Sequence, residues 1–467
     1  MRKTDNGLRD MTLGSPAGHI FCFALPLLAG SFLQQFYNMV DSWVVGKYVG
    51  DGALAAVGVG FPVLTMFASL FIGLSNGGTV VIAQSFGAGK MDQVRDAVDT
   101  IYAAFFASIL PLTGLALLLV KPILLLLRVD PAAYDEAYLY LMTVCAGLIG
   151  SVGYNLNAGI LGGLGNSRST LLFLCIAAGL NIVLDLVLVL FWGLGVLGVA
   201  LGTVAAQACS WLFGIFYINR RYPALSIRFS LRRFDGALFR RIMGIGLPAG
   251  VQMSLVSLGA MVVMSKINSY GEAFTAGYNV GFRLDQLAFL PIQSLSSAVM
   301  SFVGQNTGAR RPDRVRQGIR VTAAASALWS VLMAALLLPL GPALVGCFSK
   351  TEAVIRAGAA YLNGIMPFYP LFSVMFCLNN AMRGAGDSLF PMVDVILSLI
   401  LVRVPAVYYF AEHYGPESMY YGFAVGWAVG LALSLGWYFS GRWKRRSGLA
   451  DRGGGPDASP ESADSRY

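Results

Sequence analysis

Charged residues are scarce in this sequence of 467 residues. Only 12% are Asp, Glu, Lys or Arg, about half the share of a typical soluble domain. Histidine occurs twice, and none of the six cysteines forms a C-x-x-C pair, so no His/Cys site for a transition metal is expected. The low charge content excludes an ordinary soluble globular domain.

Catalytic motifs are also missing. The stretch "FGAGK" lacks the first glycine and the following Ser or Thr of a nucleotide-binding P-loop. The sequence contains neither H-E-x-x-H nor G-x-S-x-G, the motifs of common metalloproteases and serine hydrolases. We therefore expect no enzymatic activity, ATP hydrolysis included.

Long apolar runs dominate what is present. The chain is 56% hydrophobic, its mean hydropathy is +0.66, and runs of the length that spans a bilayer recur throughout. We predict an all-α polytopic membrane protein with twelve transmembrane helices, at residues 17–45, 53–83, 98–120, 133–157, 168–191, 195–219, 240–266, 275–306, 318–345, 354–381, 389–411 and 418–441.

The positive charges predict the orientation of these helices. If the N-terminus is cytoplasmic, the predicted outside segments hold six of the 33 Lys and Arg residues, namely Lys47, Lys121, Arg128, Lys266, Lys350 and Arg356. Arg283 and Arg403 lie within spans, and all the others lie on the inside. This bias predicts a plasma (inner) membrane protein with both termini in the cytoplasm. It also explains the net charge of +9 without a nucleic-acid partner.

The two halves of the chain repeat each other at a nearly constant offset. Shifted by 221 residues, "QSFGAGKMDQVR" (84–95) meets "QNTGARRPDRVR" (305–316), and "GGLGNS" (162–167) meets "RGAGDS" (383–388). Near the end the offset becomes 224, where "GVALG" (198–202) meets "GFAVG" (422–426). Two parallel six-helix lobes related by a pseudo-twofold axis are typical of transporters.

The repeat defines four predicted regions. They are an N-lobe at 1–219, a basic cytoplasmic linker at 220–239, a C-lobe at 240–441 and a disordered cytoplasmic tail at 442–467. Glycine pairs four residues apart predict close helix packing, at Gly73/Gly77, Gly159/Gly163, Gly198/Gly202 and Gly426/Gly430.

Ionisable residues inside spans are the main candidates for function, because an aspartate at mid-bilayer costs about 2.5–3.5 kcal/mol on insertion scales. Asp41, Asn181, Asp185 and Thr203 lie at similar depth in the outer half of the N-lobe, and no Lys or Arg within that lobe's spans can neutralise them. Such oxygen ligands suit a proton or a small hard cation. The alternative is a hydrogen-bonded cluster that only holds three helices together.

The C-lobe carries charges of both signs. Arg283, Asp285 and Arg403 share a depth in the outer half, which suggests an ion-pair network with a structural role. Asp394 lies nearer the cytoplasmic end, where we expect partial solvation. Other polar or adaptable side chains are candidates to line a substrate cavity between the lobes: Gln34, Tyr37, Asn38, Tyr154, Asn155, Asn157, Met253 and Met300.

Several of these segments resemble one family of transporters. "LPLLAGSFLQQFYNMVDSWVVGKYVG", the paired "QSFGAGK" and "QNTGAR" motifs, and "NIVLD" followed by "GVALGT" are similar to the multidrug and toxic compound extrusion (MATE) family, over about residues 14–441. The resemblance implies a twelve-helix, two-lobe antiporter. It also implies an N-lobe cation site at Asp41, Asn181, Asp185 and Thr203. Helix 7 lacks the acidic residue of some members, so we expect coupling in the N-lobe.

The expected function is export of organic, often cationic, compounds in exchange for H+ or Na+. The expected partners are a small organic substrate and the lipid bilayer, with no nucleic acid, no cofactor besides the coupling ion, and a monomeric state. Two alternatives remain at this stage. One is a flippase for lipid-linked saccharides from the same superfamily, against which the absence of cationic residues in the N-lobe spans argues. The other is a membrane enzyme or receptor without transport activity.

Overall fold

The computed structural model describes residues 7–126, 131–227, 234–446 and 449. This part of the chain forms helices and turns and contains no strand. Eleven of its helices are long and apolar enough to cross a membrane, and a bent helix pair brings the number to twelve. The predicted all-α, twelve-span architecture is confirmed.

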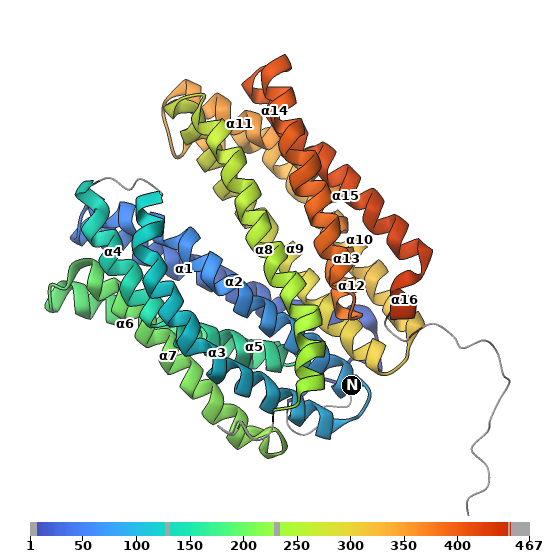
Figure 1. The fold of residues 1–467 in the computed structure, drawn as a ribbon. Coiled ribbons are helices and arrows are strands. Elements are labelled where there is room, and N and C mark those ends of the chain that lie inside the picture. Colours follow the sequence, from blue (N-terminus) through green and yellow to red (C-terminus); the bar gives the residue numbers. More distant parts are fainter. Residues whose placement is uncertain (1–6, 127–130, 228–233, 447–448, 450–467) are drawn as a thin grey trace, which may run out of the picture.

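Six spans form the first bundle, the N-lobe (Figure 1). Its elements are α1 (Pro16–Tyr48), α2 (Asp51–Gly87), α3 (Met91–Leu126), α4 (Pro131–Ala146), α5 (Leu148–Gly163), α6 (Ser167–Leu186), the π-helical η1 (Val187–Phe191) and α7 (Gly195–Arg221). The fourth span is a bent pair, because α4 and α5 meet at Gly147 at an angle of 49°. A short 3-10 turn, η2 (Pro223–Leu225), follows α7.

The second bundle, the C-lobe, repeats this plan. It contains α8 (Gly236–Asn268), α9 (Glu272–Gly308), α10 (Pro312–Gly346), α11 (Glu352–Ile365), η4 (Met366–Phe368), α12 (Tyr369–Gly384), α13 (Leu389–Val395), the π-helical η5 (Ile396–Val402), α14 (Arg403–Tyr414), η6 (Pro416–Tyr420) and α15 (Tyr421–Ser440). The predicted tail begins with a further short helix, α16 (Arg442–Arg446), in which Trp443 is buried. The rest of that tail, apart from residue 449, lies outside the described residues, as do residues 228–233 of the predicted linker.

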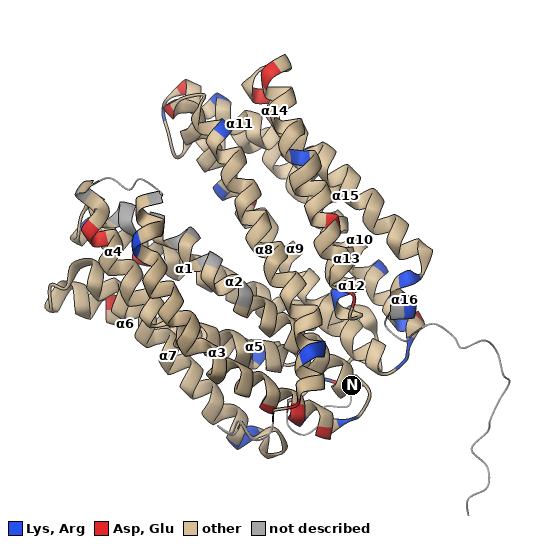
Figure 2. Cartoon of the chain, viewed as in Figure 1, with Lys and Arg blue, Asp and Glu red and all other residues tan. Residues whose placement is uncertain are grey.

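The two lobes meet at one end and diverge toward the other (Figure 1). We call the first the closed end; it carries the α2–α3 and α9–α10 turns and the first residues of α8. The other, the open end, carries the first residues of α4 and α11. Hydrogen bonds between the lobes lie in the half toward the closed end, where the Ser69 and Ser254 hydroxyls are 2.8 Å apart. Charged residues stand mostly toward the two ends of the bundles and are rare between them (Figure 2).

Glycines bring helix backbones into contact at the predicted places. A Cβ on Gly73 or Gly77 of α2 would collide with backbone carbonyls of α8. In the N-lobe, a Cβ on Gly163 would press on the backbone of α2. Gly426 and Gly430 of α15 pack on Ser398 in η5 in the same way. The small-residue pairs therefore serve as packing contacts, as predicted.

Candidate functional site: a carboxyl pair in the N-lobe

Two adjacent helices place three of the predicted ion-site residues together. Asn181 and Asp185 lie one turn apart on α6 and are both buried, at 3% and 0% exposure. The Asn181 Nδ2 atom lies 3.3 Å from Asp185 Oδ1 and 3.4 Å from Thr203 Oγ1 on α7. The amide thus bridges a carboxyl group and a hydroxyl group inside the lobe.

Asp41 completes the group from α1. Its carboxyl interacts directly with that of Asp185, so two acidic groups face each other, Asp185 fully buried and Asp41 half-buried. Three buried oxygens have no hydrogen-bond partner: Asp41 Oδ1, Asn181 Oδ1 and Asp185 Oδ2. Two carboxylates in contact repel each other unless a proton or cation lies between them. We call Asp41, Asn181, Asp185 and Thr203 the carboxyl site.

The local backbone explains how α7 approaches so closely. Gly202 leaves room for the Asp185 carboxyl, since a Cβ there would collide with Asp185 Oδ1. The π-helical η1 begins two residues after Asp185, and such bulges are frequent at functional sites. Tyr140 of α4 also lies close enough to act electrostatically on both aspartates. Its ring packs on Gly60 of α2, a neighbour that the sequence analysis missed.

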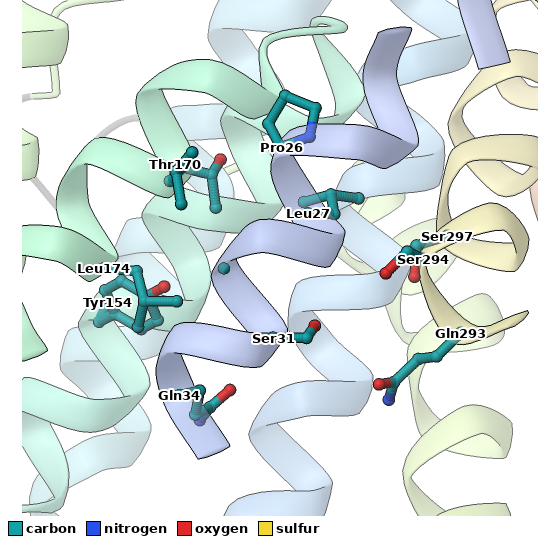
Figure 3. A pocket seen from close by; sticks show the side chains of 12 residues that line it. Pro26, Leu27, Ser31, Gln34, Tyr154, Thr170, Leu174, Gln293, Ser294 and Ser297 are labelled. Carbon is teal, nitrogen blue, oxygen red and sulfur yellow. The ribbon is translucent and has the colours of Figure 1, made fainter. Parts of the chain in front are cut away.

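A cavity of about 220 Å³ opens between the N-lobe and α9 (Figure 3). Its lining includes Gln34 and Tyr154, as predicted, and Pro26, Leu27, Gly30, Ser31, Thr170, Leu171, Leu174, Gln293, Ser294 and Ser297. Tyr37 interacts with Gln34 and lies near Asp41. Gln34 and Asp41 are seven residues apart on α1, roughly 10 Å along its axis. One helix therefore connects the cavity to the carboxyl site.

Two predicted cavity residues lie elsewhere, and this part of the prediction was wrong. Asn157 is fully buried in the N-lobe, where its Nδ2 donates to the Trp211 carbonyl at 2.9 Å and its Oδ1 accepts from the Tyr102 hydroxyl. Met300 is 7% exposed and belongs to a hydrophobic core. Both sit on helices that are apolar on several faces, so the sequence does not indicate which face is inward.

The remaining predicted cavity residues, Asn38, Asn155 and Met253, are half-buried. The Asn155 amide donates to the Ser151 carbonyl of its own helix at 2.8 Å. None of the three belongs to the lining of the described cavity.

The predicted C-lobe ion-pair network does not form among the described residues. Asp285 Oδ2 instead accepts from the Tyr361 hydroxyl at 3.0 Å. The Arg403 guanidinium lies 5.0 Å from the centre of the Phe423 ring, and Arg283 is exposed. A shared depth did not imply a shared helix face, and Asp285 and Arg403 contact aromatic side chains instead. Asp394 is not partly solvated as expected, because it is 0% exposed.

The closed end contains contacts that the sequence analysis did not assign. Gln84 Oε1 accepts from Arg241 Nη2 at 2.6 Å, so the second span is tied to the start of α8. The N-terminal segment crosses the seam between lobes, since Arg9 N donates to Leu164 O at 3.2 Å and Met11 N donates to Gln305 Oε1 at 2.9 Å. Both glutamines stand in the repeated "QSFGAGK" and "QNTGARR" motifs, which was the available signal.

Comparisons with known proteins agree with this architecture. The MatE family model matches residues 26–187 and again 248–409, once in each lobe. A probable multidrug resistance protein, YpnP of Bacillus subtilis, is 28% identical over 93% of this chain and 97% of its own length. An FAD transporter of Shewanella oneidensis is 23% identical over 84% of this chain and 88% of its own length.

Solved structures share the fold. A MATE protein crystallised in a bent conformation has a TM-score of 0.87 at 23% identity, over 96% of this chain and all of the other. An outward-facing multidrug resistance MATE transporter has a TM-score of 0.86 at the same identity and coverage. With its family model matched in both lobes, twelve spans and two similar bundles, this chain is an integral membrane protein that belongs to the MatE family of transporters.

Proposed function

We propose that this protein is a secondary active antiporter that exports organic, often cationic, compounds across the plasma membrane in exchange for H+ or Na+. The observation that carries the proposal is the carboxyl site. Its two acidic groups are in contact, and three buried oxygens lack a donor. Lys and Arg stand only near the ends of the described N-lobe helices, so the transported ion itself is the missing counter-charge.

Cargo and ion compete through α1 in this proposal. Gln34 borders the cavity, and Tyr37 and Asp41 continue the same helix face toward the carboxyl site. An ion that enters from the open end binds between Asp41 and Asp185, and the resulting shift of α1 narrows the cavity and releases the cargo. The relatives that are described as a probable multidrug resistance protein and an FAD transporter support an organic cargo.

The closed end faces the cytoplasm in this proposal, together with both termini. The excess of arginine and lysine there supports that orientation (Figure 2), and the described conformation is then open to the outside. A membrane potential of 100 mV contributes about 2.3 kcal/mol per charge moved, or roughly fiftyfold in a concentration ratio. The protein works as a monomer and needs no cofactor besides the ion.

Efflux from proteoliposomes tests the proposal. Proteoliposomes that contain the purified protein are loaded with a fluorescent organic cation. A pure proton gradient is imposed across their membrane first, and a pure sodium gradient in a second experiment. We expect efflux under at least one gradient and none without a gradient. Efflux that proceeds equally without any ion gradient would exclude antiport.

The carboxyl site is tested by Asp185→Asn. We expect loss of gradient-driven efflux with normal membrane insertion, because the amide removes the charge that holds the ion. Asp135→Asn is the matched control, since Asp135 is an exposed acidic residue of the same lobe. Equal efflux from the two variants would place coupling elsewhere.

A further inference from the structure

A second buried carboxyl group lies in the C-lobe. Asp394 of α13 is 0% exposed, and its neighbours Asn379 of α12 and Ser434 of α15 are 2% and 0% exposed. Asn379 Nδ2 donates to Asp394 Oδ2 at 2.7 Å, and Ser434 Oγ lies 3.0 Å from the same oxygen. The other carboxyl oxygen, Oδ1, is buried and has no hydrogen-bond partner.

No charged group in the part of the chain that the structure describes forms an ion pair with this carboxyl. The elements packed against α13 are α8, α12, η5 and α15. Helix α8 carries no charged side chain between Arg241 and Lys266, and η5 and α15 contain none. Helix α12 carries the neutral thiol of Cys377 and the guanidinium of Arg383.

Arg383 is engaged elsewhere. Its guanidinium donates to Gln252 Oε1 at 2.7 Å and to Asn380 Oδ1 at 3.2 Å, whereas Asn379 and Ser434 are the side chains that hydrogen-bond the Asp394 carboxyl among the described residues. Burying an ionised carboxylate without a counter-charge costs several kcal/mol. Asp394 is therefore expected to hold a proton in this conformation.

The hydrogen bonds accommodate both forms of the acid. A serine hydroxyl both donates and accepts, and Ser434 Oγ also lies 3.2 Å from Asn379 Oδ1. When Asp394 is ionised, Ser434 donates to Asp394 Oδ2. When the proton is on Oδ2, that O–H donates to Ser434 Oγ, whose own proton turns to Asn379. Gain or loss of the proton thus needs one hydroxyl rotation and no repacking.

The repeat indicates that packing alone does not require an acid here. The offset of 221 pairs Asp394 with Phe173, and the offset of 224 pairs Ser434 with Ser210. In the N-lobe, Ser210 Oγ donates to the Phe173 carbonyl at 2.7 Å. Ser210, the N-lobe equivalent of Ser434, therefore hydrogen-bonds to a backbone carbonyl. The two helices can form this contact without a carboxyl group, which is present only in the C-lobe.

A π-helical segment follows this aspartate as it follows the one in the carboxyl site. The segment η5 begins two residues after Asp394, and η1 begins two residues after Asp185. Ser398 in η5 donates to the Asp394 carbonyl at 2.6 Å. That contact is to the backbone of Asp394, so its carboxyl stands at the start of a stretch of helix whose hydrogen bonding is irregular.

We propose that Asp394, Asn379 and Ser434 form a second proton-binding site, so that each transport cycle moves one proton through the C-lobe. The carboxyl O–H bond breaks when the lobe admits water, the proton passes to that water, and the carboxylate takes a proton back in the next half-cycle. Asp394 lies six residues past Ser388, roughly 9 Å from the closed end, whereas the carboxyl site lies toward the open end. This inference rests on the proposed antiport.

Infrared difference spectra of the purified protein between about pH 6 and pH 10 test proton binding directly. Exposed carboxyl groups, whose ordinary pKa values are about 3.9–4.3, are ionised throughout this range. We expect a protonated-carboxyl band that Asp394→Asn abolishes and Asp185→Asn leaves in place. The amide matches the protonated acid in shape and keeps both partners. If Asp394→Asn does not fold, Ser434→Ala, which retains the acid, is expected to shift the frequency of that band. An unchanged spectrum in the folded variant overturns the proposal.

Transport stoichiometry gives the second readout. We expect a folded Asp394→Asn protein to carry one proton fewer per cycle. The ratio of cargo concentrations that it maintains across the membrane should then be about tenfold lower per unit of pH gradient, because one pH unit is worth a factor of ten per proton. If wild-type vesicles show no ion-driven efflux, the proposed antiport fails while the infrared result still decides whether Asp394 binds a proton. If efflux is proton-driven and equally steep in the variant, the second site alone is overturned.

Discussion

Gln84 and Gln305 make the same hydrogen bond in opposite directions across the lobe boundary. Gln84 Nε2 donates to the Gly384 carbonyl of the C-lobe at 3.1 Å. Gln305 Nε2 donates to the Gly163 carbonyl of the N-lobe, also at 3.1 Å. Both the donors and the acceptors are separated by 221 residues, the offset of the sequence repeat. The lobes are thus joined at the closed end by two equivalent hydrogen bonds, which the pseudo-twofold axis relates to each other.

Glycine permits these two hydrogen bonds. A Cβ on Gly87 would collide with the Gln305 carbonyl, and a Cβ on Gly308 would collide with the Gln84 carbonyl. These glycines are again related by the repeat. The motifs that revealed the repeat in the sequence are therefore the ones that hold the lobes together.

Replacing either glutamine by alanine is expected to loosen the closed end. A typical hydrogen bond contributes about 1 kcal/mol, and each glutamine also accepts a second one, from Arg241 Nη2 or from Met11 N. Each variant should therefore increase transient opening by more than about fivefold. Hydrogen–deuterium exchange over residues 84–90 and 305–311 measures this opening. Gln317→Ala is the control, because Gln317 is exposed at the same end. Exchange in Gln84→Ala as slow as in the control would contradict the assignment.

Arg314→Ala is expected to release the N-terminal segment. Its guanidinium donates to the Met11 carbonyl at 2.9 Å, the Gly14 carbonyl at 2.7 Å and Asn306 Oδ1 at 3.0 Å. Loss of bonds to a charged group, each worth about 1.5–3 kcal/mol, should expose the segment to limited proteolysis and lower the melting temperature. Arg316→Ala removes only an exposed pair with Asp313, worth about 0–1 kcal/mol. Similar digestion of both variants would contradict the role of Arg314.

Depth along a helix could be predicted from the sequence, and it placed neighbouring polar residues of the N-lobe at the same level. Asn181, Asp185 and Thr203 were predicted to lie at similar depth, and the Asn181 Nδ2 atom lies 3.3 Å from Asp185 Oδ1 and 3.4 Å from Thr203 Oγ1. Depth suffices there because α6 and α7 are consecutive, so a short turn fixes their relative height and keeps them adjacent.

Rotation about the helix axis could not be predicted. Asp285 and Arg403 share a depth yet find aromatic partners, because a span that is apolar all round gives no sign of its inward face. Burial of Asp394 depends on the way α12 and α15 pack over it, which the sequence pattern does not indicate. The break at Gly147, where a Cβ would collide with Val204, is also a tertiary effect.

Gly202→Ala is expected to disable the carboxyl site without removing any of its polar atoms. The added methyl group collides with Asp185 Oδ1, so the carboxyl must turn away from Asn181 and Asp41. We expect gradient-driven efflux to fall at least about tenfold, the cost of roughly 1.4 kcal/mol in ion binding. Gly179→Ala on α6 is the matched control, since nothing lies within 4 Å of its added Cβ. Full efflux from Gly202→Ala would show that this carboxyl position is not needed.

The cavity beside α1 is expected to set the size of the exported compound. Its volume of about 220 Å³ is smaller than that of typical small-molecule sites, which is about 300–1,000 Å³. A bulky compound would therefore be in close contact with the residues that line it. Ser31→Trp would fill most of it, while Ser31→Ala keeps its volume and removes only a hydroxyl. We expect the tryptophan variant to lose efflux of large dyes. Its ion binding, measured by calorimetry on purified protein, should be weaker than that of the alanine variant, because a filled cavity opposes the narrowing that accompanies ion binding. Equal efflux of large dyes from both variants would place the cargo outside this cavity, because a filled cavity has no room for a second occupant.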